Sequence, residues 1–174
     1  SVHVQANWDP SDPVGETRWC QGVADVHGFP HGIVAHADLA GDDVAEVLEA
    51  HSRHANLRGI RMILGHTADP RQDAAGGHDL LSDPAWRRGF ALLERFNLSF
   101  DFQIFPAQME AAAAAAAAHP GIQTVICHTG MPFDRSPEGL DTWRRGLARF
   151  AQLPNVPAKL SGPHMFLPNW TVES

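Results

Sequence analysis

Three ionisable residues lie within or directly after short apolar runs of the chain. His128 follows Val-Ile-Cys within TVICHTGMP at 124–132, Arg61 lies within IRMIL, and Lys159 lies within AKLSG. A neutral imidazole at the end of a strand can bind a metal ion, transfer a proton or polarise a carbonyl group. A guanidinium between apolar neighbours is costly to bury without a partner, so Arg61 is a candidate ligand for a carboxylate or carbonyl oxygen.

Each of these residues also has a structural interpretation, which the sequence leaves open. The histidine could be a hydrogen-bonded structural residue, Arg61 could pair internally with Asp38 or Asp101, and Lys159 could form a structural ion pair. Further polar candidates stand at the ends of other apolar runs. Gln103 and Gln5 offer neutral hydrogen bonds to hydroxyl or carbonyl groups, and Asp38 is either a base or a supporting residue.

The elements that would position these side chains alternate between strand-like and helix-like segments. Six strands are predicted, at residues 2–7, 32–37, 57–63, 98–104, 124–127 and 156–160. Five helices are predicted, at residues 13–23, 42–54, 83–96, 108–119 and 140–153. This alternation indicates βα units and a parallel sheet.

The spacing of about 25–40 residues per strand–helix pair is typical of a (β/α)8 TIM barrel, which needs roughly 250 residues. We therefore predict an α/β fold in which residues 1–174 form a single partial TIM-barrel domain. It would have about six of the eight strands, namely strands two to seven. The alternative is a complete, six-stranded, doubly wound sheet.

Side chains alternate across a strand, so each predicted strand can be divided into two faces. One face is apolar, and the other carries polar residues: His3, Gln5 and Asn7; His36 and Asp38; Arg61; Asp101 and Gln103; His128; Lys159 and Ser161. Polar groups on six buried strands predict a shared polar cavity at the carboxyl ends, as opposed to a merely satisfied polar interior. The long segment 64–82, with His66 and His78, is either a lid or binding loop or disordered.

Composition and charge restrict the class of partner. The chain is 44% hydrophobic and 19% charged, with a net charge of -7, which argues against a nucleic-acid partner. We expect no membrane segment, because the longest run of low polarity, residues 111–118, is too short to span a bilayer. Two cysteines and no signal peptide favour a cytoplasmic protein. Open sheet edges in an incomplete barrel predict homo-oligomers.

The motifs taken together resemble a known family. VHVQANWDPSDPVGETRWCQ, GIVAHADL, LRGIRMIL, DPAWRRGFALLERFNLSFDFQIFPAQ, CHTGMP and AKLSG, in this order, resemble the amidohydrolase-related TIM-barrel hydrolases. Within that family the similarity is to the sugar-lactonase and pyrone-dicarboxylate lactonase branch, and it covers essentially the whole chain.

The resemblance implies a hydrolase that opens a lactone or similar ester-like ring of a small-molecule substrate. It matches His128 to the strand-six histidine and Arg61 to a strand-four arginine. Where many members have a metal-binding histidine on strand five, this chain has Gln103 or its neighbours, which argues against a binuclear metal centre. The enzyme would then be either metal-free or hold one divalent metal such as zinc, with His128 as a ligand. The strand-one His-x-His pair and the strand-eight aspartate have no counterpart, and Gln5 replaces an expected glutamate.

The leading hypothesis is therefore a lactone hydrolase. Arg61 and His128 would polarise the ring carbonyl, and Gln103, Gln5, Asp38 and Lys159 would contact the substrate. Without the water-activating aspartate, we expect these 174 residues alone to be inactive. The alternatives are a metal-dependent decarboxylase on the same fold and a catalytically inactive fragment or binding domain.

Overall fold

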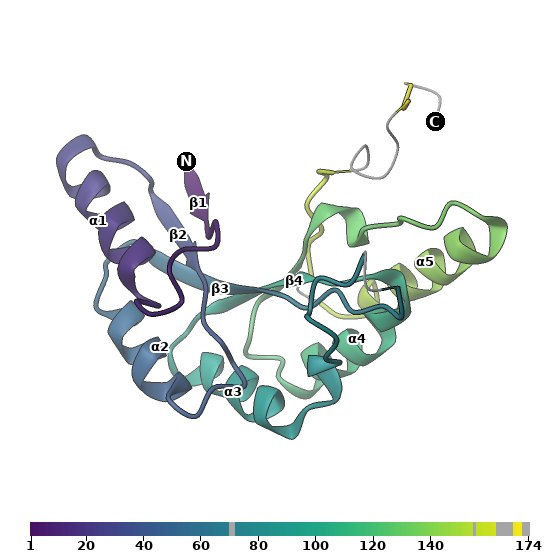
Figure 1. Ribbon diagram of the computed structural model, residues 1–174, viewed down its shortest axis with the longest axis horizontal. Coiled ribbons are helices and arrows are strands. Elements are labelled where there is room, and N and C mark those ends of the chain that lie inside the picture. The colour runs from purple at the N-terminus through teal and green to yellow at the C-terminus, as the bar shows by residue number, and fades with distance from the viewer. Residues whose placement is uncertain (70–71, 155, 163–168, 172–174) are drawn as a thin grey trace.

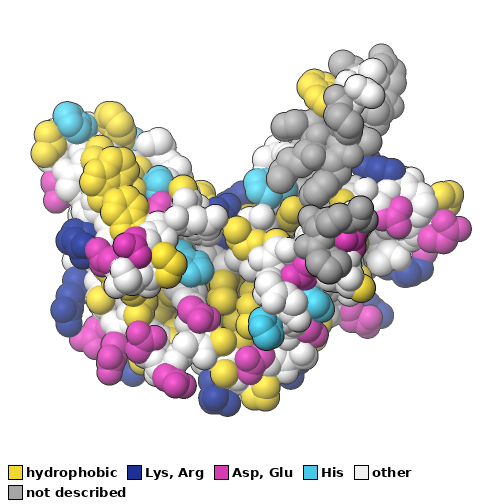
Figure 2. Space-filling model, viewed as in Figure 1, with side chains coloured by type: hydrophobic (Ala, Val, Ile, Leu, Met, Phe, Trp, Pro, Cys, Tyr) yellow, Lys and Arg dark blue, Asp and Glu magenta, His cyan; other side chains and the backbone are white. Residues whose placement is uncertain are grey.

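The computed structural model describes residues 1–69, 72–154, 156–162 and 169–171. Its centre is a parallel sheet in the order β1-β2-β3-β4-β5. The strands are β1 Val2–Val4, β2 Gly32–Ala35, β3 Leu57–Ile63, β4 Ser99–Gln103 and β5 Thr124–Ile126. The sheet is curved, with the helices along its convex side (Figure 1). The space-filling view is hollowed between the arm that carries α1 and the arm that carries α5 (Figure 2).

All five predicted helices are confirmed. They are α1 Gly15–His27, α2 Val44–Ser52, α3 Pro84–Arg95, α4 Met109–Ala118 and α5 Pro137–Phe150. Two of them begin at residues that cap them. The Asp83 side chain accepts a hydrogen bond from Ala85 N before α3, and the Ser136 side chain accepts one from Gly139 N before α5. Each cap satisfies a backbone donor that the first helical turn leaves free. None of the helices in the described part of the chain is long and apolar enough to cross a bilayer.

Three single-turn 3-10 helices follow strands or precede helices, at Leu80–Ser82, Pro106–Gln108 and His128–Gly130. The third contains the leading candidate residue, so the chain turns sharply at that residue.

Aromatic packing holds the helices to the convex face. Trp86 and Phe90 of α3 stack with ring centroids 5.1 Å apart, and both contact Phe100 and Phe102 of β4. The four side chains are at most 1% exposed. Aromatic pairs at such separations add to the free energy gained by burying their area. This layer fixes which face of β4 is turned away from the helices.

The sixth predicted strand, residues 156–160, is wrong as a strand. The segment forms one isolated parallel bridge, between Ile126 and Ala158. Ile126 N donates to Pro157 O, and Lys159 N donates to Ile126 O, each at 2.9 Å. Because Pro157 has no N–H, it cannot donate to a ladder, and the pairing does not extend. The segment still runs beside β5 and brings Lys159 to the sheet.

The connections distinguish the two predicted architectures. Consecutive strands are neighbours throughout the sheet, and the helices lie on one face (Figure 1). A doubly wound sheet reverses its strand order and carries helices on both faces. The arrangement is therefore that of a partial barrel, and the doubly wound alternative is wrong.

Candidate functional site

The concave face of the sheet carries an arginine and an aspartate side by side. Arg61 on β3 is paired in register with Asp101 on β4. Their neighbours Ile60, Met62, Phe100 and Phe102 belong to the core under the helices. Because side chains alternate across a strand, Arg61 and Asp101 point to the opposite, concave side. Gln103, two residues beyond Asp101 in β4, shares this face at the carboxyl end of the strand.

Lys159 is paired with Asp101. Its Nζ donates to Asp101 Oδ2, and the side chains are 35% and 3% exposed, respectively. Cys127 Sγ lies 4.0 Å from the same carboxylate oxygen. Burial, followed by the charge of Asp101, raises the pKa of Cys127 to about 11. The structural interpretation of Lys159, an internal ion pair, therefore agrees with the geometry, and Cys127 is a protonated thiol at neutral pH.

The guanidinium of Arg61 has one N–H donor, at Nε, without a hydrogen-bond partner among the described residues. One terminal nitrogen donates to the backbone oxygen of Gln5 at 2.5 Å, whereas Nε is buried without a hydrogen-bond partner among the described residues. The predicted alternative of an ion pair with Asp38 or Asp101 does not hold, because no ion pair among the described residues joins Arg61 to either aspartate, and the Asp101 carboxylate binds Lys159. A buried unpaired donor is costly, and it is a group that an acceptor on a ligand would satisfy.

His128 lies where the chain leaves β5. Its backbone has a φ of 52°, and that of Thr129 is 54°, both in the left-handed region. The ring Nδ1 lies 3.0 Å from Ser161 Oγ. Burial, then the charges of Arg61 and Lys159, lowers the pKa of His128 below its ordinary value. The imidazole is therefore neutral at neutral pH and within electrostatic reach of both cations.

The strand alternation predicted for β5 is wrong, although His128 still reaches this cluster. The register pairs Val125 with Asp101 and Ile126 with Phe102, so Ile126 is in the core and Cys127 is on the concave side. Continued alternation would turn His128 toward the helices. The left-handed backbone at His128 breaks the alternation and brings the ring to Ser161 and the two cations.

The faces predicted for the first strand are also reversed. His3 is paired in register with core residue Ile33, and its Nε2 lies 2.7 Å from Glu16 Oε1 on α1, so it faces the helices. Gln5 N continues the ladder by donating to Val34 O, and alternation places the Gln5 side chain with His3. That side chain is 1% exposed, with Oε1 bound to Asn7 N at 2.9 Å. Gln5 contributes its main-chain oxygen to the site, not the predicted carboxamide.

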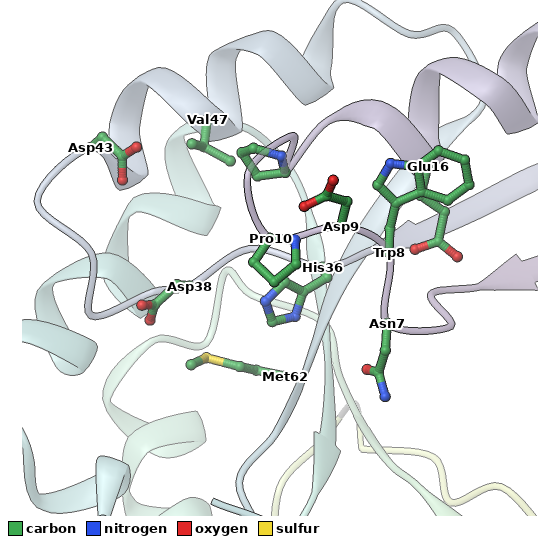
Figure 3. A pocket seen from close by; sticks show the side chains of 11 residues that line it. Asn7, Trp8, Asp9, Pro10, Glu16, His36, Asp38, Asp43, Val47 and Met62 are labelled. Carbon is green, nitrogen blue, oxygen red and sulfur yellow. The ribbon is translucent and has the colours of Figure 1, made fainter. Parts of the chain in front are cut away.

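Asp38 lies apart from this cluster. With His36 it lines a cavity of about 590 Å³ between the β1–α1 loop, the start of α2 and the end of β3 (Figure 3). Asp38 Oδ1 accepts a hydrogen bond from Ala40 N at 3.0 Å. Neither Arg61 nor His128 is among the described residues that line this cavity. The structure thus brings Arg61, His128 and Lys159 together around Asp101, places Gln103 on the same face of β4, and leaves Asp38 at a separate hollow of the carboxyl-end rim.

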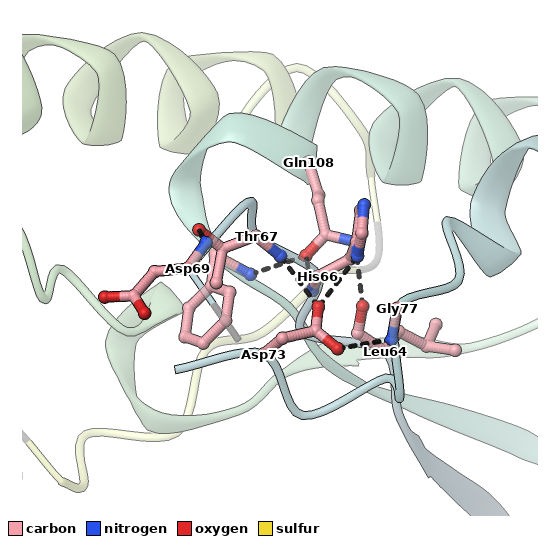
Figure 4. A network of polar contacts seen from close by, with 8 residues as sticks. Leu64, His66, Thr67, Asp69, Asp73, Gly77 and Gln108 are labelled. Atoms are coloured by element: carbon pink, nitrogen blue, oxygen red, sulfur yellow. Dashed lines mark hydrogen bonds and ion pairs between the residues drawn. The ribbon is translucent and has the colours of Figure 1, made fainter. Parts of the chain in front are cut away.

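The loop after β3 is ordered around Asp73, a residue that sequence reasoning missed. Asp73 Oδ1 is 2.7 Å from His66 Nδ1 and 2.9 Å from Thr67 N, and Oδ2 accepts from Gly77 N at 2.6 Å (Figure 4). Gln108, in the 3-10 helix after β4, ties that segment to the start of this loop, because its Oε1 accepts from His66 N and its Nε2 donates to Leu64 O. His78 is exposed. The Asp and Gly residues of this loop were the available signal, since a carboxylate readily accepts local backbone N–H groups.

The donor set of the described residues does not by itself complete a site for a metal ion. Within the described part of the chain, no group of three or more His, Cys, Asp or Glu side chains is placed to hold one. His128 is the candidate ligand, but its cluster contains Arg61 and Lys159, and Lys159 occupies the Asp101 carboxylate. Stable sites for zinc need three or four protein ligands. The residues of this cluster therefore do not hold a zinc ion by themselves.

The sheet is parallel, its consecutive strands are neighbours, and polar side chains gather on its concave side. These features define the chain as part of a (β/α) barrel, the fold in which enzymes have their active sites at the carboxyl ends of the strands. A family model described as Amidohydrolase matches residues 1–174, and the chain belongs to the amidohydrolase family.

Two curated proteins are similar to the chain. The protein named Uncharacterized protein y4mH, from Sinorhizobium fredii (strain NBRC 101917 / NGR234), is 42% identical over 174 residues, which cover 100% of this chain and 58% of that protein. The L-fucono-1,5-lactonase of Burkholderia multivorans (strain ATCC 17616 / 249) is 34% identical over 134 residues, covering 75% of this chain and 43% of the enzyme.

A solved structure shows the same fold. An amidohydrolase from Burkholderia multivorans, crystallised with bound HEPES, superposes with a TM-score of 0.74 at 30% identity, covering 95% of this chain and 55% of that one. Crystals of an amidohydrolase from that organism with bound zinc give a TM-score of 0.74 at 29% identity, covering 95% and 54%. The fold is therefore an incomplete (β/α)8 barrel, and the chain spans about half the length of the relatives it matches.

Proposed function

We propose that the concave cluster is the carbonyl-binding part of a lactone hydrolase. The observation that carries the proposal is that Arg61 on β3, with its unpaired Nε, and a neutral His128 just after β5 flank β4 on the same concave side of the sheet. Membership of the amidohydrolase family supports a hydrolase. The 34% identity to L-fucono-1,5-lactonase supports a lactone as the substrate.

The reaction that this geometry suits is the addition of water to the ring carbonyl. The carbonyl oxygen becomes negative as the C–O bond to water forms, and the ring ester bond then breaks to release a hydroxy acid. Arg61 Nε would donate to that oxyanion, and the positive charge of Arg61 would stabilise it.

His128 can donate the second hydrogen bond if Ser161 holds it in the right tautomer. When the Ser161 hydroxyl donates to Nδ1, the proton of the neutral ring is on Nε2, which then faces an acceptor as a donor. The 3.0 Å contact between Nδ1 and Ser161 Oγ is compatible with this assignment. Gln103, on the same face, would orient the substrate ring, and Lys159 would hold Asp101 and add positive charge.

The step that these residues do not supply is the activation of water. Asp101 is the acid of the cluster, and it is bound to Lys159. The resemblance assigns water activation to an aspartate on another strand. We therefore expect the 174 residues alone to open no lactone, and a chain extended through its flanking coding sequence to do so.

The test is a pH-indicator assay of L-fucono-1,5-lactone hydrolysis by the 174-residue chain and by the extended chain. Activity in the extended chain, lost on Arg61→Met, supports the proposal. Comparable turnover by both chains would refute the division of roles. Turnover of no lactone by a folded extended chain would refute the function itself.

A further inference from the structure

The cavity that contains Asp38 is a separate hollow whose lining differs from that of the concave cluster. It has a volume of about 590 Å³ and is bordered by the β1–α1 loop, the first turn of α1, the β2–α2 loop and the end of β3. Figure 3 shows Trp8 and Glu16 on one side of it, and Asp38 and Asp43 on the other. This volume is within the range of pockets that hold small molecules.

The polar lining selects against anions. Four carboxylates line the cavity, from Asp9, Glu16, Asp38 and Asp43, and no lysine or arginine is among its described lining residues. Two hydrogen bonds from Ser11, one of them from its backbone N–H, lower the pKa of Asp9 below its ordinary value, so this side chain is ionised at neutral pH. An anionic ligand would be repelled at this position.

In three of these carboxylates, only one of the two oxygen atoms accepts the hydrogen bonds that hold the side chain. Asp9 Oδ1 accepts from Ser11 N at 2.9 Å and from Ser11 Oγ at 2.8 Å. Glu16 Oε1 accepts from Ala6 N at 2.8 Å and lies 2.7 Å from His3 Nε2, and Asp38 Oδ1 accepts from Ala40 N. In each group these hydrogen bonds use a single oxygen atom and fix the orientation of the carboxylate. Each therefore keeps a second oxygen with acceptor capacity.

The carboxylates are spread around the cavity and do not converge. Among the described residues, no three His, Cys, Asp or Glu side chains are placed to share a metal ion. A single point cation would need such convergence. Separated acceptors around one cavity instead match several hydroxyl donors that project from a ring.

An aromatic ring and aliphatic groups complete the lining. Trp8 borders the cavity, is 44% exposed, and stacks on Trp19 with ring centroids 6.4 Å apart. Val47 and Met62 add apolar surface. Indole faces provide a flat apolar surface with little conformational freedom to lose, which suits the C–H face of a sugar ring.

We propose that this cavity binds the uncharged, polyhydroxylated ring of a sugar, with Trp8 against the ring and the carboxylates of Asp9, Glu16, Asp38 and Asp43 accepting from its hydroxyl groups. The site is distinct from the Arg61–His128 cluster and does not depend on lactone hydrolysis. Asn7 and His36, which also line the cavity, add neutral hydrogen-bonding groups.

The probes are methyl β-D-glucopyranoside, methyl β-D-galactopyranoside and methyl α-L-fucopyranoside, none of which is a lactone. Binding to the 174-residue chain is measured by saturation-transfer NMR and titration. We expect saturable binding of at least one glycoside, weakened about tenfold by Asp38→Asn and by Trp8→Ala, the loss of one charged hydrogen bond or one stacked ring. Asp25→Asn is the matched control, because it removes one exposed carboxylate of α1 outside the cavity.

Circular dichroism establishes that each variant is folded, and Asp9→Asn replaces Trp8→Ala if that variant is not. Three results would overturn the proposal. The first is no saturable binding of any glycoside up to roughly 50 mM, a free energy weaker than about 2 kcal/mol. The second is binding that Asp38→Asn leaves equal to the Asp25→Asn control. The third is preferential binding of choline chloride, used as the cationic probe.

Discussion

The ion pair between Lys159 and Asp101 is the charged contact among those that attach the segment after α5 to the sheet, and its removal has a predictable cost. Breaking a fully buried pair by removing one partner costs about 3–5 kcal/mol. An exposed pair contributes about 0.2–1 kcal/mol. Here the carboxylate is 3% exposed and the lysine 35% exposed. Lys159→Met therefore leaves a buried charge whose partner was partly in water, and we expect a loss of about 2 kcal/mol.

The assay is urea unfolding at pH 7, applied to Lys159→Met, Asp101→Asn and the double variant. The double variant should be more stable than the sum of the two single losses predicts, with a coupling free energy of at least about 1 kcal/mol. Arg53→Met is the control, because its pair with Glu49 spans 3.4 Å, and the side chains are 73% and 62% exposed. That change should cost less than about 0.5 kcal/mol.

Two results would refute this reasoning. If Lys159→Met costs no more than Arg53→Met, the pair does not exist in solution. If the two single losses simply add, Lys159 and Asp101 act independently, and the segment after α5 is held to the sheet by other contacts.

Four further predictions rest on other contacts. Cys127, whose pKa is about 11, should react with iodoacetamide at pH 8 far more slowly than a free thiol until urea unfolds the chain; rapid labelling of the folded chain contradicts its burial. His51 is fully buried, and burial lowers its pKa to about 4, below the 6.5 of the unfolded chain. The free energy of unfolding should therefore be highest above pH 6.5 and should fall by ~3 kcal/mol as the pH decreases toward 4. His51→Gln should reduce this pH dependence in urea titrations. Asp73→Ala should speed amide exchange at Gly77, whereas Asp79→Ala in the same loop should not, and equal effects would remove the role of the Asp73 carboxylate. Light scattering should show self-association through the free edge of β1, and a clean monomer at all concentrations would count against it.

The sequence was sufficient to predict five of the six strands and all five helices, because their signals are local. Residues 57–63 form a strand with the predicted bounds, and all five helices lie within a few residues of their predicted positions. In β2, β3 and β4 the predicted faces are also right, because each has a continuous apolar face, such as Ile60 with Met62, that must pack under the helices.

The wrong predictions come from features that the alternation of side chains along a strand does not reveal. In the first strand both faces are mixed, and the pairing of His3 with Ile33 decides which one meets the helices. At His128 a left-handed backbone re-aims the side chain, so the correct neighbours were predicted by an incorrect argument. The segment around Ala158 failed as a strand because Pro157 limits its ladder. Asp73 was missed because its partners include backbone N–H groups, and the Asp and Gly residues of the loop do not by themselves say which carboxylate accepts them.

The central claim is that Arg61 and His128 act on one carbonyl oxygen. It is tested most directly by kcat/KM for L-fucono-1,5-lactone in the extended chain, measured for Arg61→Met, His128→Gln and the two changes combined. Losing one preorganised oxyanion donor costs about 10²–10³-fold, and two donors on the same atom should be strongly non-additive. We predict that each single change lowers kcat/KM by a factor of that size, and that the double variant has a kcat/KM only slightly below that of the less active single variant. Retention of full activity by either single variant would contradict the claim.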